Sequence, residues 1–333
     1  MTASRPTVLL TGSTGVIGAS LLPSLAMHHD VTALVHRRRP QGATACVQGD
    51  LTANGLGLST RERRELAAGI DIVVHCAGLT TFAPDLTLFD DVNAEGTRQI
   101  LELAEQADVP VVLISSNAAV AAVDTPGDDL SARTIRAYGR SKQRSEHLAA
   151  QCRQPVAIVR PALLFAARDA VSMPQQFPHV LLTALLQGQP GRLPLHPDQW
   201  ADILPMETLV SYLTALTQAM LRGDASACGL HWTTAGPARV TAADLERACL
   251  DFLREEGRPA PGPLLAAPTA QPRRTHGLAR VAQLGFATAD QPPLPTDLTR
   301  YLPTQPTRSD VLDALAHNVR RCAPWAVADA PGH

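Results

Sequence analysis

The sequence predicts an α/β protein built on a doubly wound parallel sheet, with a smaller C-terminal domain. Three observations carry this prediction. Short β-branched runs alternate with longer amphipathic stretches through the first half of the chain. A glycine-rich loop directly follows the first of these runs, and the composition changes after Pro161. At 333 residues the chain is also long for one compact core.

The alternation is regular enough to place each element. Buried strands are expected at Thr7–Leu10, Val31–Val35, Ile70–His75, Val111–Ser115 and Val156–Arg160, with a short run at Ala45–Gln48. Helices are expected at Ile17–Met27, Arg61–Ala68, Val92–Ala107 and Tyr138–Cys152. Strand, helix and strand in this rhythm indicate parallel βαβ units with right-handed crossovers.

The second half is less regular. Residues 166–197 are rich in Pro, Gln and Gly around one apolar helical run, Val180–Leu186. A helix at Glu207–Arg222 and a late strand from Gly229 return to the sheet, and the tail from Arg258 to Pro306 is dense in proline. We therefore assign residues 1–165 to a nucleotide-binding domain with returning elements at about 200–240. Residues 166–200 and 241–333 are assigned to a substrate-binding region.

Composition excludes several classes of function. The net charge is −2, which disfavours nucleic acid and acidic membranes as partners. No apolar run approaches the roughly 18 residues that span a bilayer, and no apolar signal segment precedes the first strand. The six cysteines are scattered without a CxxC pair, so no metal site is expected. These features favour an enzyme of the reducing cytosol, with a cytoplasmic location.

The glycine-rich loop predicts a dinucleotide site of the Rossmann type. It runs Thr11-Gly-Ser-Thr-Gly-Val-Ile-Gly18 between a strand and an apolar helix. Gly12 permits the tight turn, Gly15 lets the backbone approach a pyrophosphate, and Gly18 lets helix and strand pack closely. The helix N-terminus offers free N–H groups to the phosphates. The expected cofactor contacts here are Gly12, Ser13, Thr14, Gly15, Val16, Ile17 and Gly18.

The second strand indicates which dinucleotide binds. It ends in His36-Arg-Arg-Arg39, where an NAD site would usually place an acid for the ribose 2′-hydroxyl. Guanidinium groups match a phosphate instead, so Arg37 and Arg38 are the expected 2′-phosphate ligands and NADPH the expected cofactor. Asp50 and Leu51 follow where an acid can bond the adenine amine. The small residues Cys76, Ala77 and Gly78 follow where the chain must pass close to the cofactor.

A tyrosine and a lysine are the expected proton machinery. Tyr138 and Lys142 form a YxxxK on a helix, and the i, i+4 spacing puts both on one face. The ammonium should lower the pKa of the phenol toward the working pH. Ser116, just beyond a strand end, is the expected third catalytic residue, and Asn117 competes for that role. Asn93 is expected to hold the neighbouring backbone in place rather than to take part in the reaction.

Together these motifs resemble the extended short-chain dehydrogenase/reductase superfamily over roughly the first 240 residues. The Gly49-Asp-Leu-Thr and Leu56-Gly-Leu-Ser segments, and Asp202-Ile-Leu-Pro-Met206, are most similar to the branch of carrier-protein thioester reductases and fatty-acyl reductases. This resemblance implies further cofactor contacts from Ser115, Pro161 and Ala162. It implies hydride delivery to an acyl thioester, giving an aldehyde or alcohol. An acyl carrier protein with a phosphopantetheine arm is the implied partner, and Arg273 and Arg274 could supply a basic patch for it.

Three other functions fit the same residues less well. The main alternative is an NADPH-dependent reductase of a small ketone, aldehyde or imine, which would use the same Tyr138 and Lys142. A catalytically silent NADP(H) sensor would need no proton donor. A sugar-nucleotide epimerase would prefer tightly held NAD, which the arginines after the second strand oppose.

Overall fold

A seven-stranded parallel sheet forms the centre of the computed structural model, which describes residues 5–80, 85–167, 177–187, 195–258, 265 and 294–328. The strand order is β10-β6-β5-β4-β1-β2-β3, and every paired neighbour runs parallel. The strands are β1 Thr7–Thr11, β2 Asp30–Val35, β3 Ala45–Gln48, β4 Ile72–His75, β5 Val111–Ile114, β6 Val156–Pro161 and β10 Gly229–Thr233. The order reverses between β1 and β4, which is the switch point where doubly wound sheets bind ligands. The predicted fold class is confirmed.

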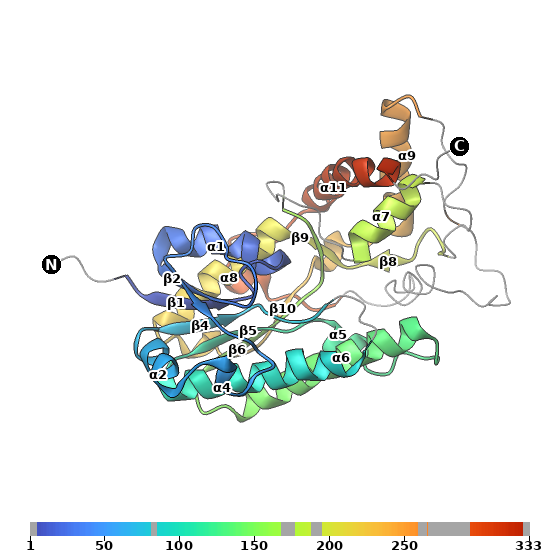
Figure 1. Ribbon diagram of the computed structural model, residues 1–333. Helices are drawn as coiled ribbons and strands as arrows, with labels where there is room; N and C mark the ends of the chain where they lie inside the picture. The colour runs from blue at the N-terminus through green and yellow to red at the C-terminus, as the bar shows by residue number, and fades with distance from the viewer. Residues whose placement is uncertain are drawn as a thin grey trace.

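Helices cover both faces of this sheet (Figure 1). One face carries α1 (Val16–His28) and α8 (Met206–Leu221), and the other carries α2 (Thr60–Ala68), α4 (Gly96–Ala107) and α6 (Leu130–Gln151). Side chains of a strand alternate between faces, so β1 contributes Leu10 to one apolar core and Leu9 to the other. Because both faces are buried, the strands read as continuous apolar runs rather than as alternating ones.

Three predicted boundaries shift in the structure. Strand β4 begins at Ile72, two residues later than expected. The helix expected from Val92 starts as a π-helical segment, η2 (Asp90–Glu95), which continues into α4. The helix expected from Tyr138 begins much earlier, at Leu130, because Asp129 caps it by accepting the Ala132 N–H at 3.1 Å. Tyr138 therefore lies in the middle of a long helix, where its position is held from both sides.

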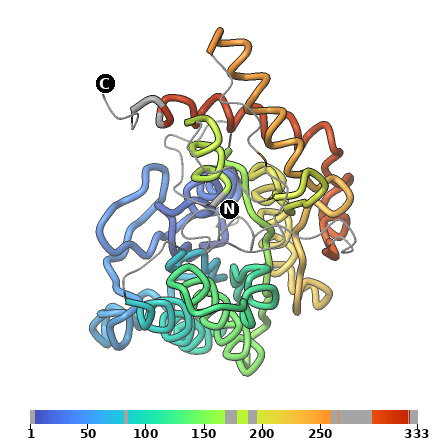
Figure 2. Tube along the Cα trace, turned by 90° about the vertical axis from the view of Figure 1, so that its right-hand side faces the viewer, coloured from blue at the N-terminus to red at the C-terminus, as the bar shows by residue number. Residues whose placement is uncertain are grey.

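The second half adds a helical group beside the sheet. Helices α7 (Phe177–Gln187), α9 (Ala242–Glu255) and α11 (Arg308–Ala328) pack together there, as Figures 1 and 2 show. Asn318 of α11 joins this group to the end of a strand, since its side chain accepts the Ala166 N–H at 2.9 Å and donates to the Ala166 carbonyl at 3.3 Å. Helices α9 and α11 lie on either side of the proline-dense tail, at residues where the sequence predicted no helix.

Short elements complete the description. Two small sheets pair β7 (Leu163–Phe165) with β9 (Ile203–Pro205) and β8 (Trp200–Ala201) with β11 (Val240–Thr241). The remaining helical turns are η1 Asn54–Gly57, α3 Thr87–Phe89, α5 Ala118–Ala121, η3 Ala225–Ala227, η4 Gly236–Ala238 and η5 Leu298–Arg300. Among the described helices, none has both the length and the apolarity to cross a membrane. In the same residues, no three His, Cys, Asp or Glu side chains gather as metal ligands would.

Candidate active site

The glycine-rich loop packs tightly between β1 and α1. Gly12 has φ +68°, and a Cβ there would lie 2.6 Å from the nitrogen of Ala77, in the segment that follows β4. A Cβ on Gly18 would collide with the Gly12 carbonyl, so this pair of positions requires glycine. Gly15 is the N-cap of α1, and its N–H bonds the Gly12 carbonyl at 2.8 Å. The loop thus brings backbone to the start of α1 without side chains in the way.

This loop fits the pyrophosphate of a dinucleotide. The first turn of α1 contains no acidic residue, so the positive end of the helix dipole is not neutralised. The Ser13 hydroxyl is buried and has no hydrogen-bond partner among the described residues. A buried hydroxyl without a partner is unfavourable, and a phosphate oxygen would satisfy it. Gly12 to Gly18 are therefore the residues that would hold the phosphates.

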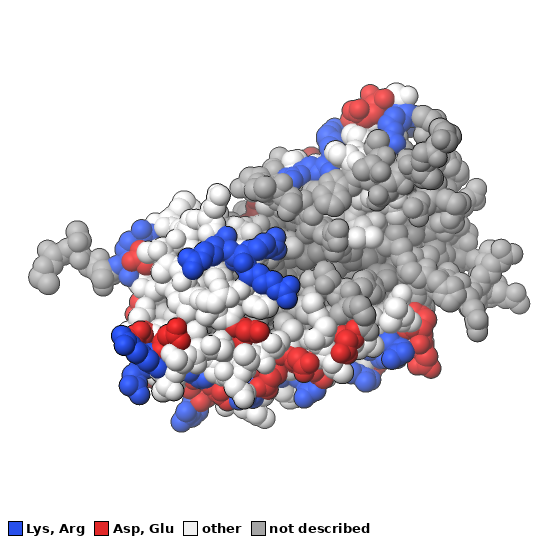
Figure 3. Space-filling model, in the orientation of Figure 1, with Lys and Arg blue, Asp and Glu red and all other residues white. Residues whose placement is uncertain are grey.

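Basic side chains follow β2. Arg37 and Arg38 are exposed, and no described carboxylate lies within ion-pair distance of either. Figure 3 shows basic side chains gathered on the face that carries β1 and β2. The only ion pair described at this strand end joins His36 Nε2 and Asp50 Oδ2 at 3.7 Å. The two guanidinium groups thus remain available for an anion.

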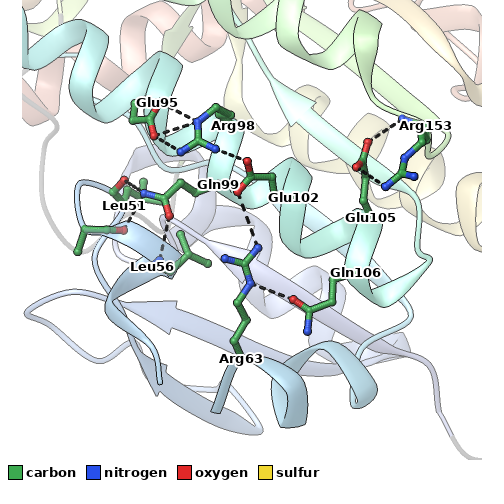
Figure 4. Close-up of polar contacts among 11 residues, drawn as sticks. Leu51, Leu56, Arg63, Glu95, Arg98, Gln99, Glu102, Glu105, Gln106 and Arg153 are labelled. Atoms are coloured by element: carbon green, nitrogen blue, oxygen red, sulfur yellow. Dashed lines mark hydrogen bonds and ion pairs between the residues drawn. The ribbon is translucent and has the colours of Figure 1, made fainter. Parts of the chain in front are cut away.

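The segment after β3 is held by a glutamine that the sequence analysis missed. Gln99 of α4 is buried; its amide donates to the Ala53 carbonyl at 2.7 Å, and its carbonyl accepts the Leu56 N–H at 3.1 Å (Figure 4). Leu56 has φ +63°, an unusual backbone conformation for a side chain of this size. Gln99 therefore fixes the loop that follows Asp50 and Leu51, the residues expected to face the adenine.

Asp50 is itself ordered locally. Its Oδ1 accepts hydrogen bonds from the Thr52 N–H at 2.9 Å and from the Thr52 hydroxyl at 2.7 Å. These two bonds lower the pKa of the Asp50 carboxyl. The group is therefore an ionised acceptor at neutral pH, which is the form that an adenine amine could bond.

A buried histidine joins three elements beneath the site. His75, at the end of β4, bonds the Thr11 hydroxyl through Nδ1 at 2.6 Å and the Thr97 hydroxyl through Nε2 at 3.3 Å. Burial lowers the pKa of His75 to about 3, so the imidazole is neutral. The Thr11 hydroxyl also accepts the Ala77 N–H at 3.1 Å. His75 thus fixes the Cys76-Ala-Gly78 backbone against the glycine-rich loop.

The residues after His75 reach the proposed catalytic lysine. A Cβ on Gly78 would lie 3.1 Å from Lys142 Nζ and 3.0 Å from Asn93 Oδ1. Asn93 holds backbone, as expected: its Oδ1 accepts the Leu79 N–H at 2.7 Å, and its amide donates to the Leu79 carbonyl at 3.1 Å. Its amide also donates to Ser141 Oγ at 2.9 Å. Gly78 therefore leaves room for Lys142 beside a fixed strand end.

The structure brings Ser116, Tyr138 and Lys142 together where β5 ends. The Ser116 side chain lies close enough to the Tyr138 phenol to lower its pKa, and its Oγ accepts the Ala118 N–H at 3.2 Å. Lys142 is buried, and its Nζ donates to the Ile114 carbonyl, the last of β5, at 3.1 Å. The competing Asn117 begins α5, and its Oδ1 lies 3.4 Å from Ser116 Oγ. Of the two, it is Ser116 that influences the pKa of the phenol.

The pKa of Tyr138 shifts in the direction opposite to the expected one. Burial raises it, and the Ser116 hydrogen bond lowers it by less. The expectation rested on the Lys142 ammonium, whose own pKa falls to about 8 because of burial. Loss of solvation thus outweighs the effect of Ser116. The consequence is a phenol that is neutral at pH 7 and can donate a proton.

Behind the strand end lies a buried ion pair that the sequence analysis did not identify. Arg160 of β6 donates to both carboxylate oxygens of Glu146, at 2.8 and 2.5 Å. The Ser115 hydroxyl donates to Glu146 Oε1 at 2.5 Å, so this hydroxyl points at Glu146 rather than at Tyr138.

The other predicted contacts follow β6. The Pro161 carbonyl accepts the Asn117 N–H at 3.1 Å, and the Ala162 N–H donates to the Thr233 carbonyl at 2.9 Å. Ser115, Pro161 and Ala162 thus line the same strand ends.

Comparison with known proteins places the chain in a family. Residues 40–213 match the family described as male sterility protein, which is just over half of the chain. Two curated relatives illustrate the match. The hybrid PKS-NRPS synthetase pvhA of Talaromyces variabilis is 26% identical over 230 residues, which cover 64% of this chain and 6% of that protein. A 4-hydroxy-2-methyl-3-oxo-4-farnesyl-3,4-dihydroquinoline-1-oxide ketoreductase of Stigmatella aurantiaca is 32% identical over 180 residues, covering 50% of this chain and 52% of that protein.

Solved structures share the fold. The terminal R domain from the myxalamid PKS-NRPS biosynthetic pathway superposes with a TM-score of 0.69 at 20% identity, covering 100% of this chain and 94% of that one. The Bordetella bronchiseptica enzyme WbmG in complex with NAD gives a TM-score of 0.64 at 18% identity, covering 98% and 96%. The matched segment is thus a small part of the synthetase and about half of the ketoreductase, whereas the structural likeness extends over the whole fold.

Proposed function

Because the chain belongs to the male sterility protein family and is a nicotinamide-dependent oxidoreductase of the extended short-chain dehydrogenase/reductase type, we propose that it reduces the carbonyl of an acyl thioester with NADPH. The observation that carries this proposal is the grouping of Ser116, Tyr138 and Lys142 at the end of β5, in a chain whose glycine-rich loop fits a dinucleotide. The product is an aldehyde, or an alcohol after a second reduction.

The choice of NADPH over NADH rests on the end of β2. Arg37 and Arg38 are exposed and carry no described carboxylate partner, so a 2′-phosphate would meet two free guanidinium groups. The acid at this site, Asp50, is tied to Thr52 and lies 3.7 Å from His36. It comes from the loop after β3, and the end of β2 itself carries no acid.

The chain's own residues then manage the proton. Ser116 lowers the pKa of the Tyr138 phenol, although by less than burial raises it. The phenol O–H is then free to donate to a carbonyl oxygen, and Ser116 stabilises the phenolate that remains. Lys142 places a positive charge beside the same strand end. When bound, NADPH supplies the hydride.

Thioester chemistry adds a leaving group to this scheme. Two-electron reduction of a thioester consumes one hydride and one proton and releases an aldehyde and a free thiol. Tyr138 would donate its proton to the carbonyl oxygen while the carbon becomes tetrahedral, and the carbon–sulfur bond then breaks. A positioned acid at the developing oxyanion is the stabilisation that this geometry can provide.

The proposed substrate class rests on similarity to two proteins and on the division of the chain into two regions. One relative is a hybrid PKS-NRPS synthetase, and the R domain with a similar fold comes from a PKS-NRPS biosynthetic pathway. We propose that residues 1–165 and 200–240 hold the cofactor, while residues 166–200 and 241–333 face an acyl carrier protein. Arg273 and Arg274, expected to help in docking, lie outside the described residues.

A second candidate is favoured by one relative. The Stigmatella protein is a ketoreductase, so the same Tyr138 and Lys142 could serve a free ketone, aldehyde or imine. The two candidates differ in the leaving group. The test uses S-octanoyl-pantetheine with NADPH carrying deuterium at C4 of the nicotinamide. We expect deuterated octanal or octanol together with free pantetheine. Deuterium incorporated from a ketone panel, with none from the thioester, would favour the second candidate.

A further inference from the structure

The contact between α5 and α6 has no side chain at its closest point. Gly139, directly after Tyr138, is buried in the middle of α6. A Cβ there would lie 2.7 Å from the Ala118 carbonyl oxygen, 2.9 Å from Ala122 Cβ and 3.1 Å from the Ala122 carbonyl carbon. Two of these three atoms are backbone of α5, so no side-chain rotation could relieve the contact. The two helices can therefore lie this close only with glycine at position 139.

Ser116 is held by hydrogen bonds to α5, the helix that contacts α6 at Gly139. Ser116 precedes α5, and both its polar groups bond the first turn: Oγ accepts the Ala118 N–H at 3.2 Å and the carbonyl accepts the Ala119 N–H at 3.0 Å. Ser116 must move when α5 moves. Tyr138 in turn is adjacent to Gly139 on α6, so the spacing of the two helices sets the spacing of the two side chains.

Two arginines hold the chain after α5 down on the same helix. Arg140 Nε donates to the Val123 carbonyl at 3.2 Å, and Arg136 Nη1 donates to the Thr125 carbonyl at 2.6 Å. Arg136 also lies 3.5 Å from the Asp128 carboxylate. These bonds come from residues two positions before and two positions after Tyr138. These bonds hold the segment after α5 against α6, and the absence of a side chain at Gly139 leaves room for the close contact between the two helices.

We propose that Gly139 is a positioning residue for the reaction: by letting α5 contact the backbone of α6, it brings the Ser116 hydroxyl to Tyr138. This inference rests on the proposed function, because it assumes that Ser116 and Tyr138 act on the substrate. Glycine inside a helix is otherwise less favourable than alanine, so the residue carries a cost in stability that the close contact explains. Alanine at 139 should separate the helices and lengthen the distance between the Ser116 hydroxyl and the Tyr138 phenol.

The test is a double-mutant cycle with Gly139→Ala and Ser116→Ala, in which NADPH oxidation with S-octanoyl-pantetheine and with octanal is followed. We expect Gly139→Ala to lower turnover about 10-fold or more in the wild-type background and less than about 2-fold in Ser116→Ala, because the hydroxyl that it displaces is already gone. The affinity for NADPH should be unchanged in both variants. Gly69→Ala is the matched control, since a Cβ there meets only ordinary contacts, at 3.4 Å and beyond, and should leave turnover unchanged.

Equal losses in both backgrounds, or no loss in the wild type, would overturn the role of Gly139. An unchanged turnover in Ser116→Ala alone would instead reject the proposed chemistry, and the inference with it. Should Gly139→Ala fail to fold, Ala122→Val enlarges the α5 side of the same contact and takes its place in the cycle. Crystal structures of the variants add a readout without substrate: the Ser116 Oγ to Tyr138 Oη distance should increase, and an unchanged distance contradicts the proposal.

Discussion

The Ser116 side chain lies close enough to the Tyr138 phenol to lower its pKa, at the point where the last residues of β5 meet α6. The first turn of α5 holds Ser116, and Tyr138 lies in the middle of α6, so two helices set the positions of the two side chains. Burial keeps the phenol neutral, and the serine stabilises the phenolate that proton donation leaves. The predictions below follow from this relationship and from the binding residues around it.

Tyr138→Phe should lower turnover by about 10²-fold or more, because it removes a positioned acid. The ring packs edge-on against Phe89 with 6.0 Å between centroids, so phenylalanine keeps this packing and NADPH binding should persist. Steady-state turnover and NADPH affinity measure both effects. Tyr301→Phe is the matched control: it removes a buried hydroxyl without a described partner and should leave turnover unchanged. Near-wild-type turnover in Tyr138→Phe would exclude the phenol from the reaction.

Replacing Arg37 and Arg38 by serine should raise the Michaelis constant for NADPH far more than that for NADH, since only NADPH presents a 2′-phosphate. The loss should shrink at high salt, because exposed charges are screened. Steady-state kinetics with both cofactors give the ratio. The control changes Arg61 and Arg64 of α2, which also lie on the surface. Equal changes for the two cofactors would assign Arg37 and Arg38 a role outside cofactor choice.

The pH profile of reduction should fall on its alkaline side through about 8. Burial lowers the pKa of Lys142 to about 8, so the ammonium is present below this pH and is lost as the pH rises through it. The Tyr138 pKa is raised, so the phenol remains protonated over the same range. The kcat/KM for NADPH reports the free enzyme and is the quantity to measure. In Lys142→Arg the positive charge persists, so the alkaline fall in kcat/KM should disappear. An alkaline fall that remains in this variant would have to come from the titration of another group.

Asp202→Asn should stabilise the fold at neutral pH. Burial raises the pKa of Asp202 to about 6, although its Oδ1 accepts the Ala235 N–H at 2.7 Å. A carboxyl with a raised pKa contributes its full stability below its ordinary pKa of 3.8 and loses it as the pH rises through about 6. At pH 8 the free energy of unfolding of the variant should therefore exceed that of the wild type by about 1–3 kcal/mol, and its unfolding temperature should be higher. Toward pH 4 the two stabilities should converge. Asp313→Asn, at an exposed position, should show no such pH-dependent difference.

The sequence predicted those features that short-range patterns encode. The parallel strands, the loop from Gly12 to Gly18 and the helix carrying Tyr138 and Lys142 all depend on residue type at fixed spacing, and the structure contains each of them. The sign of the Tyr138 pKa shift was wrong, because burial is a property of the assembled fold.

The other omissions are of long-range contacts. Gln99 of α4 bonds the loop after β3, and Arg160 of β6 pairs with Glu146 of α6. No local motif marks such partners. The helices α9 and α11 were missed for a different reason: they lie on either side of the proline-dense tail, and no local motif marked these two segments as helices that pack on α7.

The central claim, reduction of a thioester, is tested most directly by NADPH oxidation against a matched panel. The panel contains S-acyl-pantetheines of increasing chain length, the corresponding free aldehydes, and simple ketones and imines. The proposed function predicts NADPH consumption with the thioesters, release of one free thiol per thioester reduced, and loss of both in Tyr138→Phe. Brisk reduction of ketones or imines, with no NADPH consumed by any pantetheine or carrier-bound thioester, would contradict the claim.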